Sequence, residues 1–581
     1  TADEAVSTFK QVRDTGPEFA GLFAIALSAQ AYAMVARQHL GEAVSAAQKA
    51  LELLARPGIS NRMGEASLLT ASAHVILATA RLQLGLPDEA LVSARAARSA
   101  LHQHVPSPVG KAQLLLAESY RWEGLALAGL DRPDDALAPL QTAAELLEVL
   151  GSDYPPVTVP LASALSVLGI CHQQLGNTDL AVQTADRSIA LLDKPGQLHP
   201  SARTVLAQSL LVHARGWGER GDDAEAYHGF ERILELYGND PPDDPGGVLA
   251  LGTALAITSR YLWVQGDMGT AIERLTKADA VFRSVQPHAG AAIPITAAHA
   301  EALASLADCQ AALGDVAGAA QSAAQALDLL RGCQPHTQPQ LTFMHGWLAK
   351  FLAQCLMHLD QSPAETIDEA IDAFRSLTIP EAAIELVQAL NLRASHQNSL
   401  GDTASAAESA AEAVSLCRTI TNQPGALPLI ASTLRLLGWF LIRLRRPAEA
   451  LAPFQESASR FRDLTGTPEC PVIEHAEVEL GLGLCLTALG RSPEANDHLQ
   501  TALDLLRSLA ASDPLQSPAL AQAIMVLSEQ LITYKQELDI HDNMPALAQI
   551  LDLNATILAR SGEQAAAESI EEYARRWQDD R

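Results

Sequence analysis

One two-helix pattern recurs along the whole chain. Its clearest copy runs from Leu165 to Leu192, where two amphipathic stretches flank a turn at Gly176-Asn177. We align the copies by their turn residues, which are Gln38, Gly85, Asp131, Gly176, Gly221, Gly266, Gly314, Asp360, Gly401, Arg445 and Gly490. Seven of these eleven residues are Gly, as expected where a helix ends in a left-handed conformation.

Small residues recur at fixed distances from these turns. Seven residues before the turn stand Ala31, Ala78, Gly124, Gly169, Ala214, Ser259, Ala307, Ala353, Ala394, Gly438 and Gly483. Five residues after it stand Ala43, Ala90, Ala136, Ala181, Ala226, Ala271, Ala319, Ala406, Ala450 and Ala495. In the eighth copy a longer turn gives this role to Ala370. Because helices approach closely only across small side chains, the pattern predicts repeated helix pairs with a period of about 45 residues.

Proline-containing loops separate the copies. They lie at Pro57-Gly58, Pro106 to Pro108, Pro155-Pro156, Pro195 to Pro200, Pro241 to Pro245, Pro287, Pro335 to Pro339, Pro380, Pro424 to Pro428, Pro468 to Pro471 and Pro514 to Pro518. Proline stops a helix and disfavours helical backbone at the residue before it. Each copy is therefore predicted to be a helix, a turn, a second helix and a loop.

Composition agrees with an all-α chain and excludes several partners. Hydrophobic residues make up 48 % of the chain but aromatic residues only 4 %, which suits packing between Ala- and Leu-rich helices. The formal net charge of -28 disfavours nucleic acid and anionic membranes as partners. We see neither an uninterrupted apolar run of about 18 residues nor a signal peptide, so we expect no membrane span. Seven Cys without a CxxC pair predict free thiols and a cytoplasmic location.

These offsets make the chain resemble the tetratricopeptide repeat family over roughly residues 20 to 510. Phe230 and Phe454 stand where the family has a large residue four positions after the second-helix Ala. The long period is similar to that of kinesin light chains and of actinobacterial arrays that accompany STAND-type NTPases or CHAT proteases. The resemblance implies an all-α, right-handed α-solenoid superhelix of about eleven to twelve helix-turn-helix repeats.

The expected organisation has four parts. An N-terminal capping helix lies in residues 1–19, the repeats in 20–515, a degenerate last repeat in 516–561 and a C-terminal capping helix in 562–581. Caps are expected because an open end of a repeat array exposes a hydrophobic face. The chain starts at Thr1, which leaves open a preceding effector domain.

No motif for catalysis is visible. The chain has no phosphate-binding GxxxxGK[ST] loop, no HExxH zinc motif and no GxSxG elbow, and Gly481-Leu482-Gly483 follows no strand. An exposed acidic turn is the favoured reading of Asp243-Asp244. Four cysteines share an offset that holds Ala or aromatic residues in other copies, and are interpreted as packing residues: Cys171, Cys309, Cys355 and Cys485. We therefore expect no catalysis, no cofactor and no metal site, although a catalytic Cys–His pair stays open.

Charge along the first helices gives the most specific expectation. By the resemblance, these helices line the concave wall, and their exposed residues lie ten, six and three positions before the turn. We call these the inner positions. Asp308 is the only acid among the 33 inner positions, against five basic residues. The polar and aromatic occupants include Arg121, Arg215, Arg260, Trp263, Lys350, Gln354, Asn391, Asn398, Arg435 and Trp439. A neutral to basic groove with aromatic anchors is predicted.

Arg and Trp dominate binding hot spots, and Arg binds carboxylates bidentately. The favoured hypothesis is a non-catalytic interaction scaffold or sensor array. Its groove would bind a protein or peptide segment with acidic side chains or a free C-terminus. Three alternatives stay open: the Arg residues pair with neighbouring repeats, the chain is a small-molecule-sensing arm of a STAND NTPase or CHAT protease system, or the groove holds an active site. A homodimer through the end helices also stays open.

Overall fold

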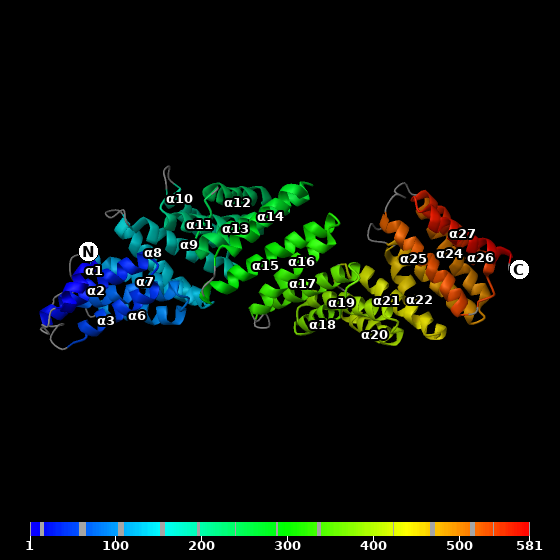
Figure 1. The fold of residues 1–581 in the computed structure, drawn as a ribbon, viewed down its shortest axis with the longest axis horizontal. Coiled ribbons are helices and arrows are strands. Elements are labelled where there is room, and N and C mark those ends of the chain that lie inside the picture. The colour runs from blue at the N-terminus through cyan, green and yellow to red at the C-terminus, as the bar shows by residue number, and fades with distance from the viewer. Residues whose placement is uncertain are drawn as a thin grey trace. The chain divides into compact units, whose positions relative to one another are not determined.

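The structure, a computed structural model, describes residues 2–11, 17–56, 66–102, 110–151, 157–193, 198–238, 240–285, 289–333, 338–421, 423, 425–464, 471–511, 518–538 and 540–579. These residues form helices and no strand, which confirms the predicted all-α class (Figure 1). The chain divides into two compact units, Thr1–Cys333 and Gln334–Arg581, and each is described by itself.

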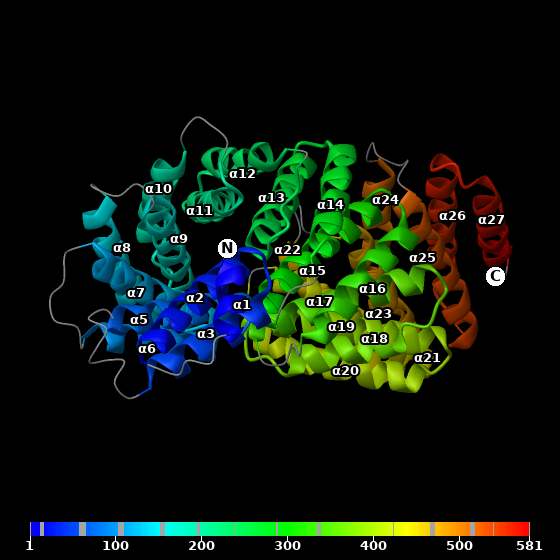
Figure 2. The same cartoon turned by 60° about the vertical axis from the view of Figure 1, so that its left-hand side comes forward.

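In the first unit a short helix, α1, packs on the first of a series of helix hairpins. The hairpins are α2/α3, α5/α6, α7/α8, α9/α10, α11/α12, α13/α14 and α15/α16, and they stack in chain order (Figure 2). The helix bounds are α1 Ala2–Gln11, α2 Pro17–Ala36, α3 Leu40–Leu54, α5 Ala66–Gln83, α6 Pro87–His102, α7 Lys111–Gly129, α8 Pro133–Gly151, α9 Thr158–Gln174, α10 Thr178–Leu192, α11 Pro200–Glu219, α12 Asp223–Tyr237, α13 Pro245–Val264, α14 Met268–Arg283, α15 Ala289–Ala312 and α16 Val316–Gly332.

The second unit continues the same pattern with one interruption. Hairpins α17/α18, α19/α20, α21/α22 and α23/α24 are followed by a single helix, α25, and by the hairpin α26/α27. The bounds are α17 Pro339–His358, α18 Ala364–Arg375, α19 Pro380–Ser399, α20 Thr403–Ile420, α21 Ala426–Arg443, α22 Pro447–Leu464, α23 Val472–Ala488, α24 Ser492–Ala511, α25 Pro518–Glu537, α26 Met544–Arg560 and α27 Gln564–Asp579.

All eleven predicted turn residues have positive φ, from 55° at Asp360 to 86° at Gly266. At Gly176, the N–H of Asn177 donates to the carbonyl of His172 over 2.8 Å, which closes the first helix before the chain reverses. The turn residues that are not Gly adopt the same left-handed conformation. All eleven predicted turn residues therefore have the backbone conformation that ends a helix in a left-handed turn.

The small residues lie where successive helices touch. Each Ala five residues after a turn is at most 1 % exposed, and Ala370 is fully buried in the eighth hairpin. Glycine is required at Gly438 on α21 and Gly481 on α23. A Cβ atom at either position would lie 2.6 Å from Cζ of Phe454 on α22. The Phe454 ring therefore fills a gap that only two glycines leave open.

Proline also acts as predicted where the structure describes it. Pro200, Pro245, Pro339, Pro380 and Pro518 are the first residues of their helices, where no intrahelical N–H donor is needed. Beside one of them, Asp244 caps α13 by accepting a hydrogen bond from the N–H of Gly247. Several predicted loop prolines lie outside the described residues, namely those at 57, 106, 108, 155, 156, 195, 287, 335, 424, 468 and 514.

The C-terminal hairpin α26/α27 keeps the spacing of the earlier ones. Its turn residue Gly562 has a φ of 93°, with Ala555 seven residues before and Ala567 five residues after. The boundary expected between residues 561 and 562 thus falls inside a hairpin. Within the described residues of the second unit, α25 is the helix that stands outside the repeat pattern.

Three helices correct the expectation that no apolar run is long enough to span a membrane. By length and composition alone, Phe19–Ala36, Pro245–Val264 and Ala426–Arg443 meet that requirement. The sequence analysis counted charged residues and turn breakers as interruptions, whereas one or two such residues lower the mean hydropathy of a segment only slightly. More than half of the second and third segments is buried inside the protein.

Candidate functional site

First helices of the first unit line a large apolar cavity, which we call the N-terminal cavity. Its volume is about 670 Å³. Its lining residues are Ile25, Ser28, Ala29, Tyr32, Val35, Leu69, Ser72, Val75, Ile76, Thr79, Leu114, Leu115, Glu118, Arg121, Trp122, Val157 and Pro160. Six of them are inner positions of the first three hairpins. The inner positions thus account for part of the wall of this hollow, and other residues in or next to the first helices form the rest.

A second hollow of about 350 Å³ is lined from six hairpins of the same unit. Leu82, Leu125, Val167, Gln208, Leu249 and Ile295 represent helices α5, α7, α9, α11, α13 and α15 in its wall. First helices that are far apart in the sequence thus converge on one concave surface. Together with the left-handed turns and the buried small residues, this arrangement shows that each copy of the sequence pattern is one helix hairpin.

The described residues form an array of helix hairpins, with the turn and packing geometry that the resemblance to tetratricopeptide repeats implies. No protein-family model matches its sequence, and no curated protein matches it. Among solved structures, the apo form of RapI is similar over 71 % of the array and 99 % of its own chain, at 12 % identity and a TM-score of 0.45.

Two further structures are similar to the array. The apo form of the quorum sensor NprR from B. thuringiensis covers 67 % of the array and 97 % of its own chain, at 12 % identity and a TM-score of 0.42. A tetratricopeptide repeat protein from Parabacteroides merdae covers 53 % and 93 %, at 18 % identity and a TM-score of 0.32. At these TM-scores, nothing about the function of this array is taken from the three proteins.

The array places glutamates beside the inner positions and so reduces the excess of basic charge expected on the inner face. Its first helices are long, so the face extends one turn beyond the inner positions, to residues 13 before the turn. Three glutamates occupy that place: Glu118, Glu301 and Glu477. Glu118 lines the N-terminal cavity, and Glu477 lines a hollow of about 420 Å³ in the second unit. The sequence analysis missed these acids because it assumed inner positions from shorter repeats.

Arg121 is engaged within its own helix. Its guanidinium pairs with the carboxylate of Glu118, with Nη2 and Oε2 2.5 Å apart, and lies over the ring of Trp122 at 4.2 Å from the centroid. The residue is 8 % exposed. Arg121 therefore presents little free charge to a partner, while the Trp122 ring forms part of the cavity wall.

Three polar residues of the second unit form hydrogen bonds or ion pairs with the following hairpin and are therefore not free to bind a partner. Lys350 on α17 donates to Glu385 and Gln388 on α19. Asn391 on α19 donates to Thr433 on α21 over 2.8 Å. Arg435 on α21 pairs with Glu474 and Glu477 on α23. These contacts match the alternative in which basic residues link neighbouring repeats.

Burial shapes the charge of the last pair. Desolvation raises the pKa of Glu477, and the neighbouring Glu474 raises it further, whereas the Arg435 guanidinium opposes both effects. Arg435 thus compensates two carboxylates of its own chain. Replacing it would leave Glu477 buried without its cation, so this residue is unsuitable for testing partner binding.

Arg215 on α11 and Arg260 on α13 are different. Both side chains are exposed, and neither has a hydrogen bond or an ion pair within 4.0 Å among the described residues. Desolvation lowers the pKa of Arg215, although Glu301 and Glu219 act in the opposite direction.

Asp308 on α15 continues this row, because it stands at the same offset in the next hairpin. It is exposed, and desolvation raises its pKa. Gln354 on α17 is exposed and Trp263 on α13 is half-buried. Asn398 on α19 accepts a hydrogen bond from Arg443 over 2.7 Å. Of the predicted residues in the first unit, Arg215, Arg260 and Trp263 thus keep surface for a partner.

Trp439 is covered by the array itself. It is 3 % exposed, and its ring stacks on Tyr534 of α25 with centroids 4.9 Å apart and an angle of 17° between the planes. Phe454 lies edge-on to the same ring at 5.4 Å. The sequence analysis expected Trp439 on the inner face but gave no sign that a later helix covers this residue.

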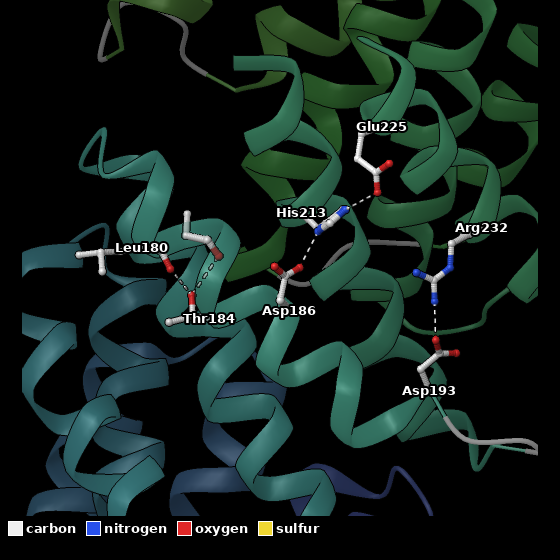
Figure 3. A network of polar contacts seen from close by, with 8 residues as sticks. Leu180, Thr184, Asp186, Asp193, His213, Glu225 and Arg232 are labelled. Atoms are coloured by element: carbon white, nitrogen blue, oxygen red, sulfur yellow. Dashed lines mark hydrogen bonds and ion pairs between the residues drawn. The ribbon is translucent and has the colours of Figure 1, made fainter. Parts of the chain in front are cut away.

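Polar contacts also tie together the second helices and the adjoining loops. Figure 3 shows His213 of α11 between Asp186 of α10 and Glu225 of α12, at 2.7 and 3.6 Å. It also shows Arg232 of α12 paired with Asp193, at the end of α10, over 2.7 Å. The contacts of Asp186 and Asp193 link hairpin α9/α10 to hairpin α11/α12, whereas the contact of His213 with Glu225 lies within the second of these hairpins.

Four buried thiols offer little nucleophilic character. Burial raises the pKa of Cys171, Cys309 and Cys417 to about 11 and that of Cys485 to about 12. A thiol with such a pKa carries almost no thiolate at neutral pH. No group of three or more His, Cys, Asp or Glu side chains with metal-binding geometry occurs in the described part of the chain.

Proposed function

We propose that the array is a binding scaffold whose first unit captures a partner segment through its carboxylates, with Arg215 and Arg260 as the binding residues. One observation carries the proposal. These two guanidinium groups occupy the same offset on successive first helices, α11 and α13, and both are exposed and unpaired among the described residues. Arg121, Lys350 and Arg435, by contrast, are paired inside the chain.

The surroundings of the two arginines favour an anion. A guanidinium binds a carboxylate through two parallel N–H···O bonds, and these bonds strengthen where water is partly excluded. Arg215 is already partly desolvated, so a bound carboxylate would supply the hydrogen-bond acceptors that water does not fully provide. Trp263 follows Arg260 by one helical turn on the same face and offers a ring for an apolar side chain of the partner.

Nearby acids limit where the carboxylate of the partner lies. Glu301 and Asp308 are exposed on the next first helix, α15. A partner carboxylate is repelled there and attracted toward α11 and α13. We therefore expect a segment with a free C-terminus or an acidic residue over the arginines, and with neutral or basic residues toward α15.

A peptide selection tests this proposal directly. A displayed library with free C-termini is selected on the full chain, and enriched peptides are measured by fluorescence anisotropy in acid and amide forms. We expect acidic or C-terminal carboxylate groups to be enriched. The double variant Arg215→Glu/Arg260→Glu should bind at least tenfold more weakly, because each partner carboxylate then meets a like charge.

The matched control carries the same charge change elsewhere in the first unit. Lys49 on α3 and Lys277 on α14 are exposed residues of second helices, outside the inner face. Lys49→Glu/Lys277→Glu should bind the selected peptides like the wild type. Equal binding to the wild type and to the arginine variant, with unchanged helical content, would contradict the proposal.

The N-terminal cavity supports a second candidate function, the sensing of a small apolar molecule. Its volume of about 670 Å³ lies within the usual range of ligand pockets, about 300–1,000 Å³. Apolar side chains dominate its wall, and the Glu118–Arg121 pair and Trp122 provide a polar and an aromatic contact. A thermal-shift screen with metabolites separates this function from peptide capture, because a cavity ligand raises Tm in the arginine variant as well.

A further inference from the structure

Helix α25 interrupts an otherwise regular array. It lies between α24 and α26 in the sequence, yet α24 packs directly on α26. Two hydrogen bonds also link hairpin α23/α24 to the residues just before α26. Asn543 donates to Thr487 on α23, and Ser492 on α24 donates to Asp542. At the C-terminal end of α26, Arg560 donates a hydrogen bond to the backbone carbonyl of Ala510 on α24. The repeat therefore continues from one hairpin to the next without using α25.

Helix α25 instead packs on the inner side of the second unit. It contacts α21 and α23, which are both first helices, as well as α26 and α27. The inner positions of these hairpins are buried, with Trp439, Ile442, Leu480 and Leu484 each at most 3 % exposed. These four side chains belong to one buried hydrophobic cluster that also contains the buried apolar side chains of α25.

The docked face of α25 is mainly apolar, and its buried Ser528 accepts a hydrogen bond from Asn554 of α26 over 3.0 Å. Ala521, Ile524, Leu527, Leu531 and Tyr534 follow the spacing of one helical face, and each is at most 5 % exposed. Gln522, Val526, Glu529, Thr533 and Gln536 are exposed on the other side. An amphipathic helix that lays an apolar stripe into a groove is a recurrent mode of binding between proteins.

We propose that the inner face of α21, α23 and α26 is a binding site for an amphipathic helix of a partner, and that α25 is its exchangeable internal occupant. The partner carries the α25 pattern, which is aliphatic residues at the positions of Ile524, Leu527 and Leu531 and an aromatic ring over Trp439. This site lies in the second unit, so its test is independent of Arg215 and Arg260 in the first.

The contacts of α25 favour exchange over permanent packing. Trp439 Nε1 and, on α25, Gln530 Oε1 are buried without a hydrogen-bond partner among the described residues, which weakens the docking. Attachment to the chain compensates for this weakness, because a tethered helix has an effective concentration in the millimolar range. A partner helix therefore binds measurably once the internal helix is released.

The test uses the full chain and a labelled synthetic peptide of residues 518–537. In the variant Leu527→Glu/Leu531→Glu, the buried charges expel α25 from the groove. We expect the peptide to bind this variant at least tenfold more tightly than the wild type, as measured by fluorescence anisotropy. Adding Trp439→Ala should weaken the binding at least tenfold, and a peptide with the same two Glu substitutions should not bind.

A matched control places charge on the exposed side of the same helix. Gln522→Glu/Val526→Glu should leave α25 docked, so this variant should bind the peptide as weakly as the wild type. Equal peptide binding to the released variant and the wild type overturns the proposal. Absence of binding to a released variant that keeps its helical content also overturns it.

Hydrogen exchange on the wild-type chain decides the question if the released variant does not fold. An exchangeable helix opens locally, without unfolding of the hairpins beneath it. We expect amides of α25 to exchange at least tenfold faster than those of α26. Equal exchange rates in the two helices would show that α25 is a fixed part of the core and would overturn the proposal.

Discussion

Glu479 on α23 is a carboxylate buried among histidines. It is 3 % exposed, with Nδ1 of His498 at 2.6 Å and Nε2 of His475 at 3.6 Å from its oxygens. Burial alone would raise the pKa of this carboxyl. The two imidazoles outweigh that effect and lower the pKa to about 2. The ionised form of Glu479 therefore stabilises the folded second unit.

This shift predicts a pH-dependent contribution to stability. Because the folded pKa lies below the unfolded one, the contribution is present above pH of about 4.5 and is lost as the pH falls toward 2. We expect Glu479→Gln to lower the free energy of unfolding by about 2–3 kcal/mol at pH 7, as measured by urea denaturation. A difference from the wild type that stays constant between pH 7 and pH 3 would contradict this prediction.

Single residues show where sequence reasoning succeeds. The turn residues were predictable, even Gln38 and Arg445, because spacing to buried small residues fixes them without reference to residue type. The pairing of Arg435 was not predictable. Its partner Glu477 stands 42 residues later, and whether the two meet depends on the length and packing of both first helices. Arg215 has a similar sequence context but remains unpaired among the described residues.

At the scale of helices, two helices pack closely on a third where each has a small residue against one large side chain. Gly438 and Gly481 flank the ring of Phe454 in this way. Gly438→Ala should cost about 1–3 kcal/mol of unfolding free energy, because the new Cβ meets the fixed ring of Phe454. In a Phe454→Leu background the same change should cost less, since a smaller side chain leaves room. Urea denaturation of the four proteins in this double-mutant cycle gives both costs. Equal costs in the two backgrounds would contradict the role of the ring.

Helices also show where prediction stops. The hairpins follow from local signals, because the turn, the small residues and the capping prolines all lie within about 45 residues. Helix α25 carries an equally clear amphipathic pattern, but its pattern does not say which surface it covers. Tyr534 stacks on Trp439, which stands 95 residues earlier in the sequence, so only the three-dimensional structure reveals the docking.

At the scale of the whole molecule, the array consists of two compact units that divide at Cys333. Repeat hairpins contact mainly their neighbours, so stability accumulates along the chain without one central core. We expect fragments 1–333 and 334–581 each to fold when produced alone. Circular dichroism should show the helical content of the parent segment, and urea should unfold each fragment cooperatively. A fragment that remains unfolded would contradict the division.

The docking of α25 has a consequence for synthesis on the ribosome. Hairpins that pack on their predecessors can assemble as they emerge, but Trp439 is covered only when Tyr534 arrives, 95 residues later. At typical translation speeds of 5–20 residues per second, the apolar surface around Trp439 therefore remains exposed to solvent for about 5–20 s. During every round of translation the nascent chain thus displays an uncovered tryptophan surface to chaperones and to any partner already present.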